Sequence, residues 1–116
     1  MKVVDINNKI SVEELKLMAA KMFGDMVKAV VDIEKGIMVV DAGMHADEEY
    51  ELLENGSEQE NLWGINFHPD QAGTDRFVVF DSMINLRPGQ GNRSRGVDNP
   101  EIQKKIKAIV AKLVTL

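Results

Sequence analysis

The stretch that decides the fold reads Met26-Val27-Lys28-Ala29-Val30-Val31-Asp32-Ile33-Glu34-Lys35-Gly36-Ile37-Met38-Val39-Val40. Residues 26–33 alternate as a strand does, and one face consists of Val27, Ala29, Val31 and Ile33. Residues 34–36 have the composition of a hairpin turn in which a glycine supplies the positive φ. Residues 37–40 are apolar on both faces, as in a strand that lies inside a sheet. The stretch therefore predicts an antiparallel hairpin within the sheet.

A helix is predicted before this hairpin. Ser11 and Glu14 have the spacing of a capping box, and Gly24 is placed to end the helix. Apolar residues recur at helical spacing between these two signals. The residues predicted to face the core are Val12, Leu15, Met18, Ala19, Met22 and Phe23.

A second helix is predicted after the hairpin. Asp47 is the expected N-cap, and Glu48 and Glu49 occupy the first turn, where the helix dipole favours anions. Tyr50 and Leu53 are expected to face inward before the helix ends near residue 54.

Residues 62–67 predict a strand whose core face carries Trp63, Ile65 and Phe67. Gly64 and Asn66 are expected on the opposite face, where the missing side chain leaves room for a group to approach the sheet. Residues 76–86 predict either one bulged strand or two strands with a bend, and the sequence leaves this open.

The last helix is predicted to begin at Pro100, with Asn99 as its N-cap. The element order is then strand, helix, strand, strand, helix, strand, strand, helix. We predict an α+β fold in a single domain over residues 1–116, with a mostly antiparallel sheet of about five strands and three helices.

The composition is that of an ordinary globular protein: 116 residues, 44% hydrophobic and 28% charged, with a net charge of −5. The acidic balance argues against general nucleic-acid binding, which needs a basic face. The absence of cysteine excludes disulfides, thiolate metal ligands and a cysteine nucleophile. Residues 1–5 (MKVVD) lack the apolar region of a signal peptide, and no apolar run approaches the roughly 20 residues that span a bilayer. We expect a cytoplasmic protein without membrane contact.

The segment Arg87-Pro88-Gly89-Gln90-Gly91-Asn92-Arg93-Ser94-Arg95-Gly96 has the composition of a binding loop. Its glycines allow close backbone approach, and its arginines offer paired donors to phosphate or carboxylate. It matches neither the Walker A motif nor G-x-G-x-x-G. We predict a small anionic ligand, with Asp81 and Asn85 as supporting polar residues. The predicted anion-binding residues are Arg87, Gly89, Gly91, Asn92, Arg93, Ser94 and Arg95.

A structural role for the same arginines fits the sequence equally well. Their guanidinium groups can pair with Glu58, Glu60 or Asp81, which would make the loop a brace within the fold. A charge-assisted hydrogen bond contributes about 1.5–3 kcal/mol, so either use is favourable. A further alternative is a homo-oligomer in which the acidic segment 47–60 of one copy meets the basic loop of another.

The two histidines, His45 and His68, are weak candidates for catalysis. Either could serve as acid or base in a hydrolase of phosphorylated or nucleotide-like substrates, with the arginines on the developing charge. His45 and the acidic residues 47–49 resemble a metal-ligand cluster, but consecutive helical residues point in different directions, so we predict no metal site. The sequence identifies no cofactor and does not decide whether the protein is an enzyme.

Three phrases carry a resemblance: residues 22–28 (MFGDMVK), residues 60–66 (ENLWGIN), and residues 81–88 (DSMINLRP) continuing through 90–95 (QGNRSR). They resemble a small family of uncharacterised prokaryotic proteins, a domain of unknown function. The resemblance covers nearly the whole chain and implies a short single-domain protein. It implies no activity, cofactor or substrate, so the function must be argued from the chemistry of the residues.

Overall fold

A five-stranded sheet forms the centre of the molecule, in a computed structural model that describes all of residues 1–116. Its strand order is β1-β4-β3-β5-β6, and all neighbours are antiparallel. The bounds are β1 Lys2–Val4, β3 Val27–Asp32, β4 Ile37–Val40, β5 Leu62–Phe67 and β6 Val78–Val79. A separate parallel pair joins β2, Ile10–Ser11, to β7, Val114–Thr115. Together with three α-helices, this architecture confirms the predicted α+β class.

The β3–β4 hairpin lies within this sheet, and its turn is closed by Asp32. Asp32 pairs with Ile37 at the end of the ladder. Its carboxylate accepts hydrogen bonds from the backbone N–H groups of Glu34 and Lys35, both at 2.9 Å. Gly36 has a φ of +68°, a conformation that glycine adopts without strain. The local sequence therefore sets the register of the central strands.

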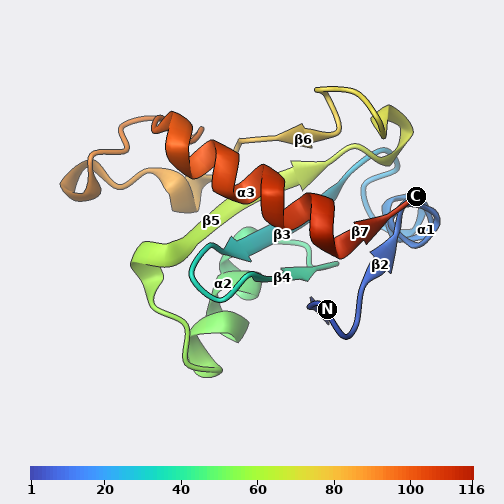
Figure 1. The fold of residues 1–116 in the computed structure, drawn as a ribbon, viewed down its shortest axis with the longest axis horizontal. Coiled ribbons are helices and arrows are strands. Elements are labelled where there is room, and N and C mark those ends of the chain that lie inside the picture. Colours follow the sequence, from blue (N-terminus) through green and yellow to red (C-terminus); the bar gives the residue numbers. More distant parts are fainter.

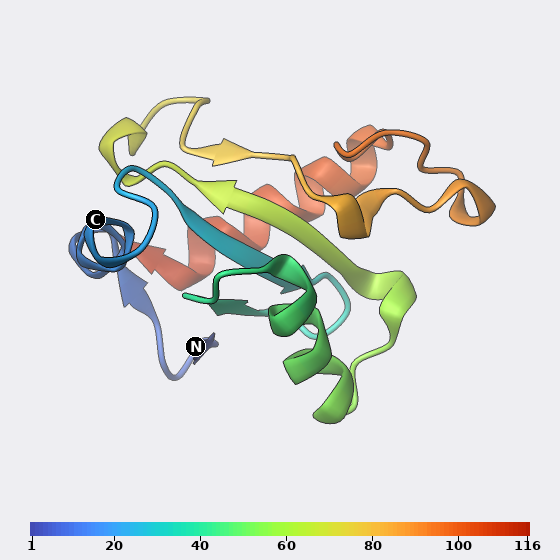
Figure 2. The ribbon, with the colours of Figure 1, turned by 180° about the vertical axis from the view of Figure 1, so that it is seen from behind.

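Helices cover both faces of the sheet, as Figure 1 and Figure 2 show from opposite sides. α3, Pro100–Leu113, lies across one face, and α2, His45–Glu54, lies on the other. α1, Val12–Lys21, contributes with α3 to a cluster of 16 buried apolar residues. The cluster on the α2 side has only four such residues, Val30, Val39, Leu52 and Leu62. The α2 face therefore has room for buried polar side chains.

None of these helices combines the length and the apolar character that a membrane crossing requires.

Both ends of α1 follow local signals, but its last predicted core residues are not buried. The Ser11 hydroxyl accepts a hydrogen bond from the Glu14 N–H at 3.1 Å, which confirms the N-cap. Gly24, with a φ of +92°, follows the end of the helix as predicted. Because the helix stops before Met22, that residue and Phe23 leave the buried stripe. They remain 48% and 38% exposed, so this part of the prediction is wrong.

The prediction for α2 is wrong about where the helix begins and which face it buries. The helix begins at His45, so Asp47 lies inside its first turn and is not the N-cap. His45 and Glu48 belong to the buried stripe, whereas Tyr50 and Leu53 are 64% and 38% exposed. Prediction from apolar spacing fails here because two members of the buried stripe are ionisable.

Residues 76–86 adopt neither of the two strand arrangements. Only β6 joins the sheet, and Met83–Asn85 forms a short 3-10 helix, η3, capped by Ser82. The side-chain amide of Asn85 takes the place of a neighbouring strand. Its Oδ1 accepts from the Gly64 N–H at 2.8 Å, and its Nδ2 donates to the Gly64 carbonyl at 2.9 Å. The edge of β5 is thereby hydrogen-bonded at this point.

Gly64 allows polar side chains on the α2 face to pack directly against β5. A Cβ at this position would lie 2.5 Å from the Cβ of Ser82, 2.6 Å from its Oγ and 3.2 Å from Cδ2 of His45. The first two distances are shorter than packed atoms tolerate. The missing side chain thus lets Ser82 and His45 pack directly against the sheet, in the space that the sequence predicts beside Gly64.

Replacing Gly64 by alanine is expected to lower the free energy of unfolding by about 2–3 kcal/mol, because the new methyl group overlaps Ser82 in a packed interior. Urea denaturation measures the change. Gly89→Ala is the matched control, since nothing lies within 4 Å of a Cβ at Gly89, and it should change stability by less than about 0.5 kcal/mol. Equal stability of the two variants would mean that the close approach at Gly64 is not required.

Candidate functional site

The loop of residues 87–96 is folded on itself by its own hydrogen bonds. Arg87 and Asn92 exchange backbone hydrogen bonds of 2.9 and 3.1 Å, which close a turn that includes Gly89 and Gly91. The side chain of Asn92 is buried, and its amide bonds to four backbone groups. These groups belong to Asn85, Ser94, Gly96 and Asp98. Asn92 therefore fixes the loop to the rest of the chain.

Arg87 is bound to the backbone rather than to a carboxylate. Its Nη1 and Nη2 donate to the carbonyls of Gln59 and Leu62, at 2.6 and 2.5 Å. Its guanidinium group lies over the ring of Trp63, 4.2 Å from the centroid, where a cation–π attraction adds to the contact. Burial lowers the pKa of Arg87, but guanidinium groups stay charged at neutral pH. Arg87 therefore acts as a brace at the start of β5.

In the next part of the loop, a carboxylate of the chain itself, that of Asp98, binds the hydrogen-bond donors. The carboxylate of Asp98 accepts hydrogen bonds from the Ser94 hydroxyl and from the Arg93 N–H, the latter at 2.8 Å. These bonds, that of Ser94 foremost, lower the pKa of Asp98. Asp98 thus occupies donors that the sequence assigns to a ligand, while the side chain of Arg93 is exposed.

Arg95 links the loop to a hollow of about 200 Å³ at the N-terminal end of α2. Its Nε pairs with Asp81 at 2.8 Å, which is one of the pairings considered from the sequence. Four segments of the chain line the hollow. They supply Lys28, residues 43–46, residues 82–84 and Arg95. The structure thus brings together His45 and Arg95, two residues singled out from the sequence, and adds Lys28.

Lys28 and Asn66 lie side by side on the sheet next to this hollow. They are paired residues of adjacent antiparallel strands, so both side chains are on the α2 face. The ammonium group of Lys28 has no carboxylate partner and lies 5.3 Å from the centroid of the Phe23 ring. Asn66 is 6% exposed, and its Oδ1 is buried without a hydrogen-bond partner. A buried acceptor without a partner is rare in native proteins.

His45 enters the hollow as a neutral imidazole. It is 7% exposed, and its Nε2 donates to the Ile65 carbonyl at 2.8 Å, because a carbonyl can only accept. Burial lowers the pKa of His45, the bond to Ile65 opposes this shift, and the charge of Lys28 adds to it. The proton is therefore on Nε2, and Nδ1 is the unprotonated ring nitrogen.

Glu48 lies one helical turn after His45 and is also uncharged at neutral pH. Its side chain is fully buried, and its Oε2 accepts a hydrogen bond from the Ala42 N–H at 3.1 Å. Burial raises the pKa of Glu48 to about 9, against the effect of the Ala42 bond. The two ionisable residues of the α2 stripe are thus both neutral near pH 7.

Sequence reasoning missed Lys28 and Ser82 as residues that line the hollow, and it missed Glu48 as a buried residue of the same helix stripe as His45. Lys28 has the pattern of an exposed strand residue, and Glu48 has that of a residue interacting with the helix dipole. The one available signal was the prediction that Gly64 and Asn66 share a face of β5. It identifies the side of the strand on which the site lies, but not the residues from other segments that pack there.

His68 does not join the hollow. It follows the last residue of β5 and precedes a short 3-10 helix, η2 Pro69–Gln71, that packs near α1, and it is not among the residues that line the hollow. Asp47 is exposed on α2, away from the buried His45. No group of three or more histidine, aspartate or glutamate side chains is arranged to hold a metal ion.

A family model described as "Protein of unknown function (DUF5674)" matches residues 4–113 of the chain. The chain belongs to this family. The match confirms the resemblance to a family of unknown function that the sequence phrases indicate. No curated protein and no solved structure matches the chain. For this DUF5674 protein, the arrangement of its own residues therefore carries the functional argument.

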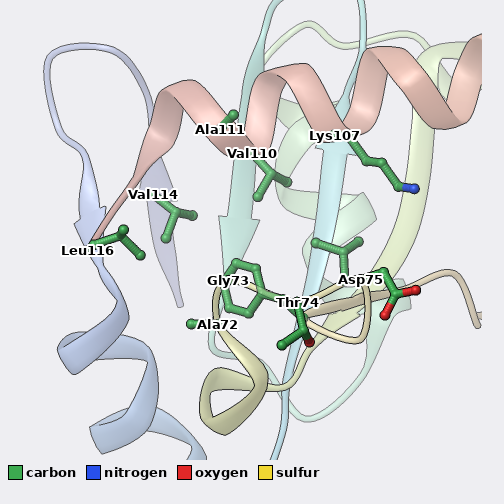
Figure 3. Close-up of a pocket in the computed structure, with 11 residues that line it drawn as sticks. Ala72, Gly73, Thr74, Asp75, Lys107, Val110, Ala111, Val114 and Leu116 are labelled. Carbon is green, nitrogen blue, oxygen red and sulfur yellow. The ribbon is translucent and has the colours of Figure 1, made fainter.

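The DUF5674 chain has a second, larger hollow of about 390 Å³ between α3 and the segment before β6 (Figure 3). Val110 and Val114 point into it, and Lys107 and Asp75 lie at one end. Its size suits a small molecule. However, most of its lining is apolar and its two charged side chains have opposite signs, so it selects neither an anion nor a cation. The smaller hollow is lined by the buried His45 together with Lys28 and Arg95 and is the better candidate for chemistry.

Replacing Arg87 by alanine is expected to lower the free energy of unfolding by about 2–3 kcal/mol, because two charge-assisted hydrogen bonds and the contact with Trp63 are lost. Urea denaturation at pH 7 measures it. Arg93→Ala, a change at an exposed arginine of the same loop, should alter stability by less than about 0.5 kcal/mol. If Arg87→Ala and Arg93→Ala are equally stable, the bracing role of Arg87 is refuted.

Replacing Glu48 by glutamine is expected to flatten the dependence of stability on pH. The folded protein keeps a proton on Glu48 up to about pH 9, whereas the unfolded chain releases it near pH 4.5. The folded state binds the extra proton across this window, so stability falls as pH rises. This group contributes a slope of about 1.4 kcal/mol per pH unit.

Urea denaturation at several pH values between about 7 and 8.5, above the ordinary titration range of histidine, measures this slope. Glu54→Gln, at an exposed position of the same helix, is the control and should keep the wild-type slope. An unchanged slope in Glu48→Gln would show that Glu48 is ionised in the folded protein.

Proposed function

We propose that the hollow at the start of α2 binds a small anionic ligand through a phosphate or carboxylate group. The observation that carries the proposal is that Lys28 and Arg95, two cations from distant parts of the chain, line one hollow. Guanidinium and ammonium groups are the side-chain donors that proteins use for such anions.

The charge balance of the hollow supports an anion. His45 is neutral, so Lys28 and Arg95 are the charged side chains among those that line the hollow. Two carboxylates lie beside it: Asp81 pairs with Arg95, and Asp41 lines a neighbouring groove together with Lys28. The residues that line the hollow therefore carry a positive charge, although the protein as a whole carries −5. A positive hollow on an acidic protein attracts a small anion to one place on its surface.

Hydrogen-bond donors remain available in the hollow. Asp81 engages Nε of Arg95, and the ion pair leaves the terminal nitrogens for another acceptor. The N-cap residue of α2, Met44, makes no side-chain hydrogen bond to the first turn. The first N–H groups of a helix lack partners within the helix and carry partial positive charge. Residues 43–46 line the hollow, so this helix end adds to the attraction for an anion.

A hydrolase is the second candidate, and His45 is the observation that favours it. The unprotonated Nδ1 of a neutral imidazole can take a proton from water, while Lys28 and Arg95 stabilise the charge that develops on a phosphorylated substrate. His68 has no part in this candidate. Phosphate release from a phosphate ester that His45→Gln abolishes, with ligand binding unchanged, would distinguish an enzyme from a binding protein.

Calorimetric titration with inorganic phosphate, and separately with acetate, tests the binding site. We expect saturable binding by the wild-type protein and at least a tenfold rise in Kd for Arg95→Gln and for Lys28→Gln. This loss corresponds to about 1.4 kcal/mol or more, the contribution of one charge-assisted hydrogen bond.

Arg93→Gln is the matched control, because Arg93 belongs to the same loop as Arg95 but its guanidinium group is exposed outside the hollow. Its Kd should equal that of the wild type. A loss of binding in Arg93→Gln alone would move the site to the loop surface, and no binding of either anion would refute the proposal.

A further inference from the structure

Two methionines form the rim of the anion hollow. Met44 at the start of α2 and Met83 of η3 both line it, and they remain 59% and 63% exposed. Ile84 lines it as well, half-buried beside Met83. The hollow therefore combines two cations with exposed apolar side chains from two different segments.

The apolar surface continues beyond this rim. The Sδ of Met22 lies 4.0 Å from the position of a Cβ at Gly43, which lines the hollow. Met22 and its neighbour Phe23 are both exposed, and the Phe23 ring faces the ammonium group of Lys28. The end of α1 thus extends the apolar rim on the Lys28 side.

Single exposed apolar residues are ordinary on a protein surface, but apolar residues grouped around a charged hollow suggest a ligand. Binding sites for small molecules typically combine apolar walls with a few polar groups that fix orientation. Methionine suits such a rim because its flexible, polarisable side chain adapts to different apolar shapes. The arrangement at Met44 and Met83 has this character.

We infer that the ligand is an amphipathic anion: a phosphate or carboxylate group joined to an apolar or aromatic substituent. The anionic group binds Lys28 and Arg95, and the substituent lies against Met44 and Met83. The inference rests on the proposed anion site and names the class of its ligand. The hollow, at about 200 Å³, is smaller than the roughly 300–1,000 Å³ of a drug-sized site. It therefore holds the anionic group, and the substituent extends over the rim.

The test compares methyl phosphate with phenyl phosphate by calorimetric titration, because the two carry the same anionic group and differ in apolar surface. Wild-type protein is expected to bind phenyl phosphate about tenfold more tightly, as burial of part of an aromatic ring implies. In the double variant Met44→Ala/Met83→Ala, which removes the apolar side chains without adding a helix-capping hydroxyl, this preference should fall to about twofold or less while methyl phosphate still binds.

Leu17→Ala is the control, because Leu17 is an exposed apolar residue of α1 that does not line the hollow. It should keep the tenfold preference. Equal affinities for the two esters in the wild type, or a preference that survives the double variant, would overturn the inference while leaving the anion site intact. If neither ester binds, the anion site and this inference both fail.

Discussion

The absence of a side chain at Gly64 is the constraint on which the polar half of this molecule depends. Only a glycine lets Ser82 and His45 come as close to β5 as they do. The same residue exchanges two hydrogen bonds with the amide of Asn85, which replaces a strand at this edge of the sheet. One small residue in a central strand thereby admits the segment 82–85 and the first turn of α2 to the same place.

The two faces of the sheet consequently bury different kinds of residue. The face under α3 buries a large apolar cluster and supplies most of the hydrophobic stabilisation. The face under α2 buries few apolar residues and instead holds His45, Glu48 and Asn66. Buried ionisable groups with shifted pKa values are typical of functional sites, although structural networks shift them too. Here His45 lines a hollow together with the cations Lys28 and Arg95, which is why we propose that this face carries the function.

Much of the fold could be predicted because its signals are local. The capping residues Ser11 and Asn99 and the alternating faces of residues 26–33 and 62–67 each depend on a few neighbouring residues. The prediction for α2 failed because counting apolar positions cannot detect a buried stripe that contains His45 and a protonated glutamate. The strand prediction for residues 76–86 was wrong because the side-chain amide of Asn85 makes the hydrogen bonds to β5 that the backbone of a neighbouring strand would make.

The candidate site was predicted only in part, for a physical reason. Composition identified an arginine-rich loop but could not show which of its donors the chain itself would use. Backbone carbonyls and Trp63 engage Arg87, and Asp98 takes the donors of residues 93 and 94. Which guanidinium group borders a hollow depends on contacts between residues far apart in the sequence, such as Lys28 and Arg95.

The central claim is that the anion site lies at the start of α2, where Arg95 is the one contributor from the arginine-rich loop, and not on residues 87–94 of that loop. NMR measurement of backbone amide shifts during titration with inorganic phosphate tests it most directly. The account predicts saturable shifts for residues 43–46 and for the amides of Lys28 and Arg95, while residues 89–93 stay unchanged. Shifts confined to residues 89–93, or no saturable shift anywhere, would contradict it.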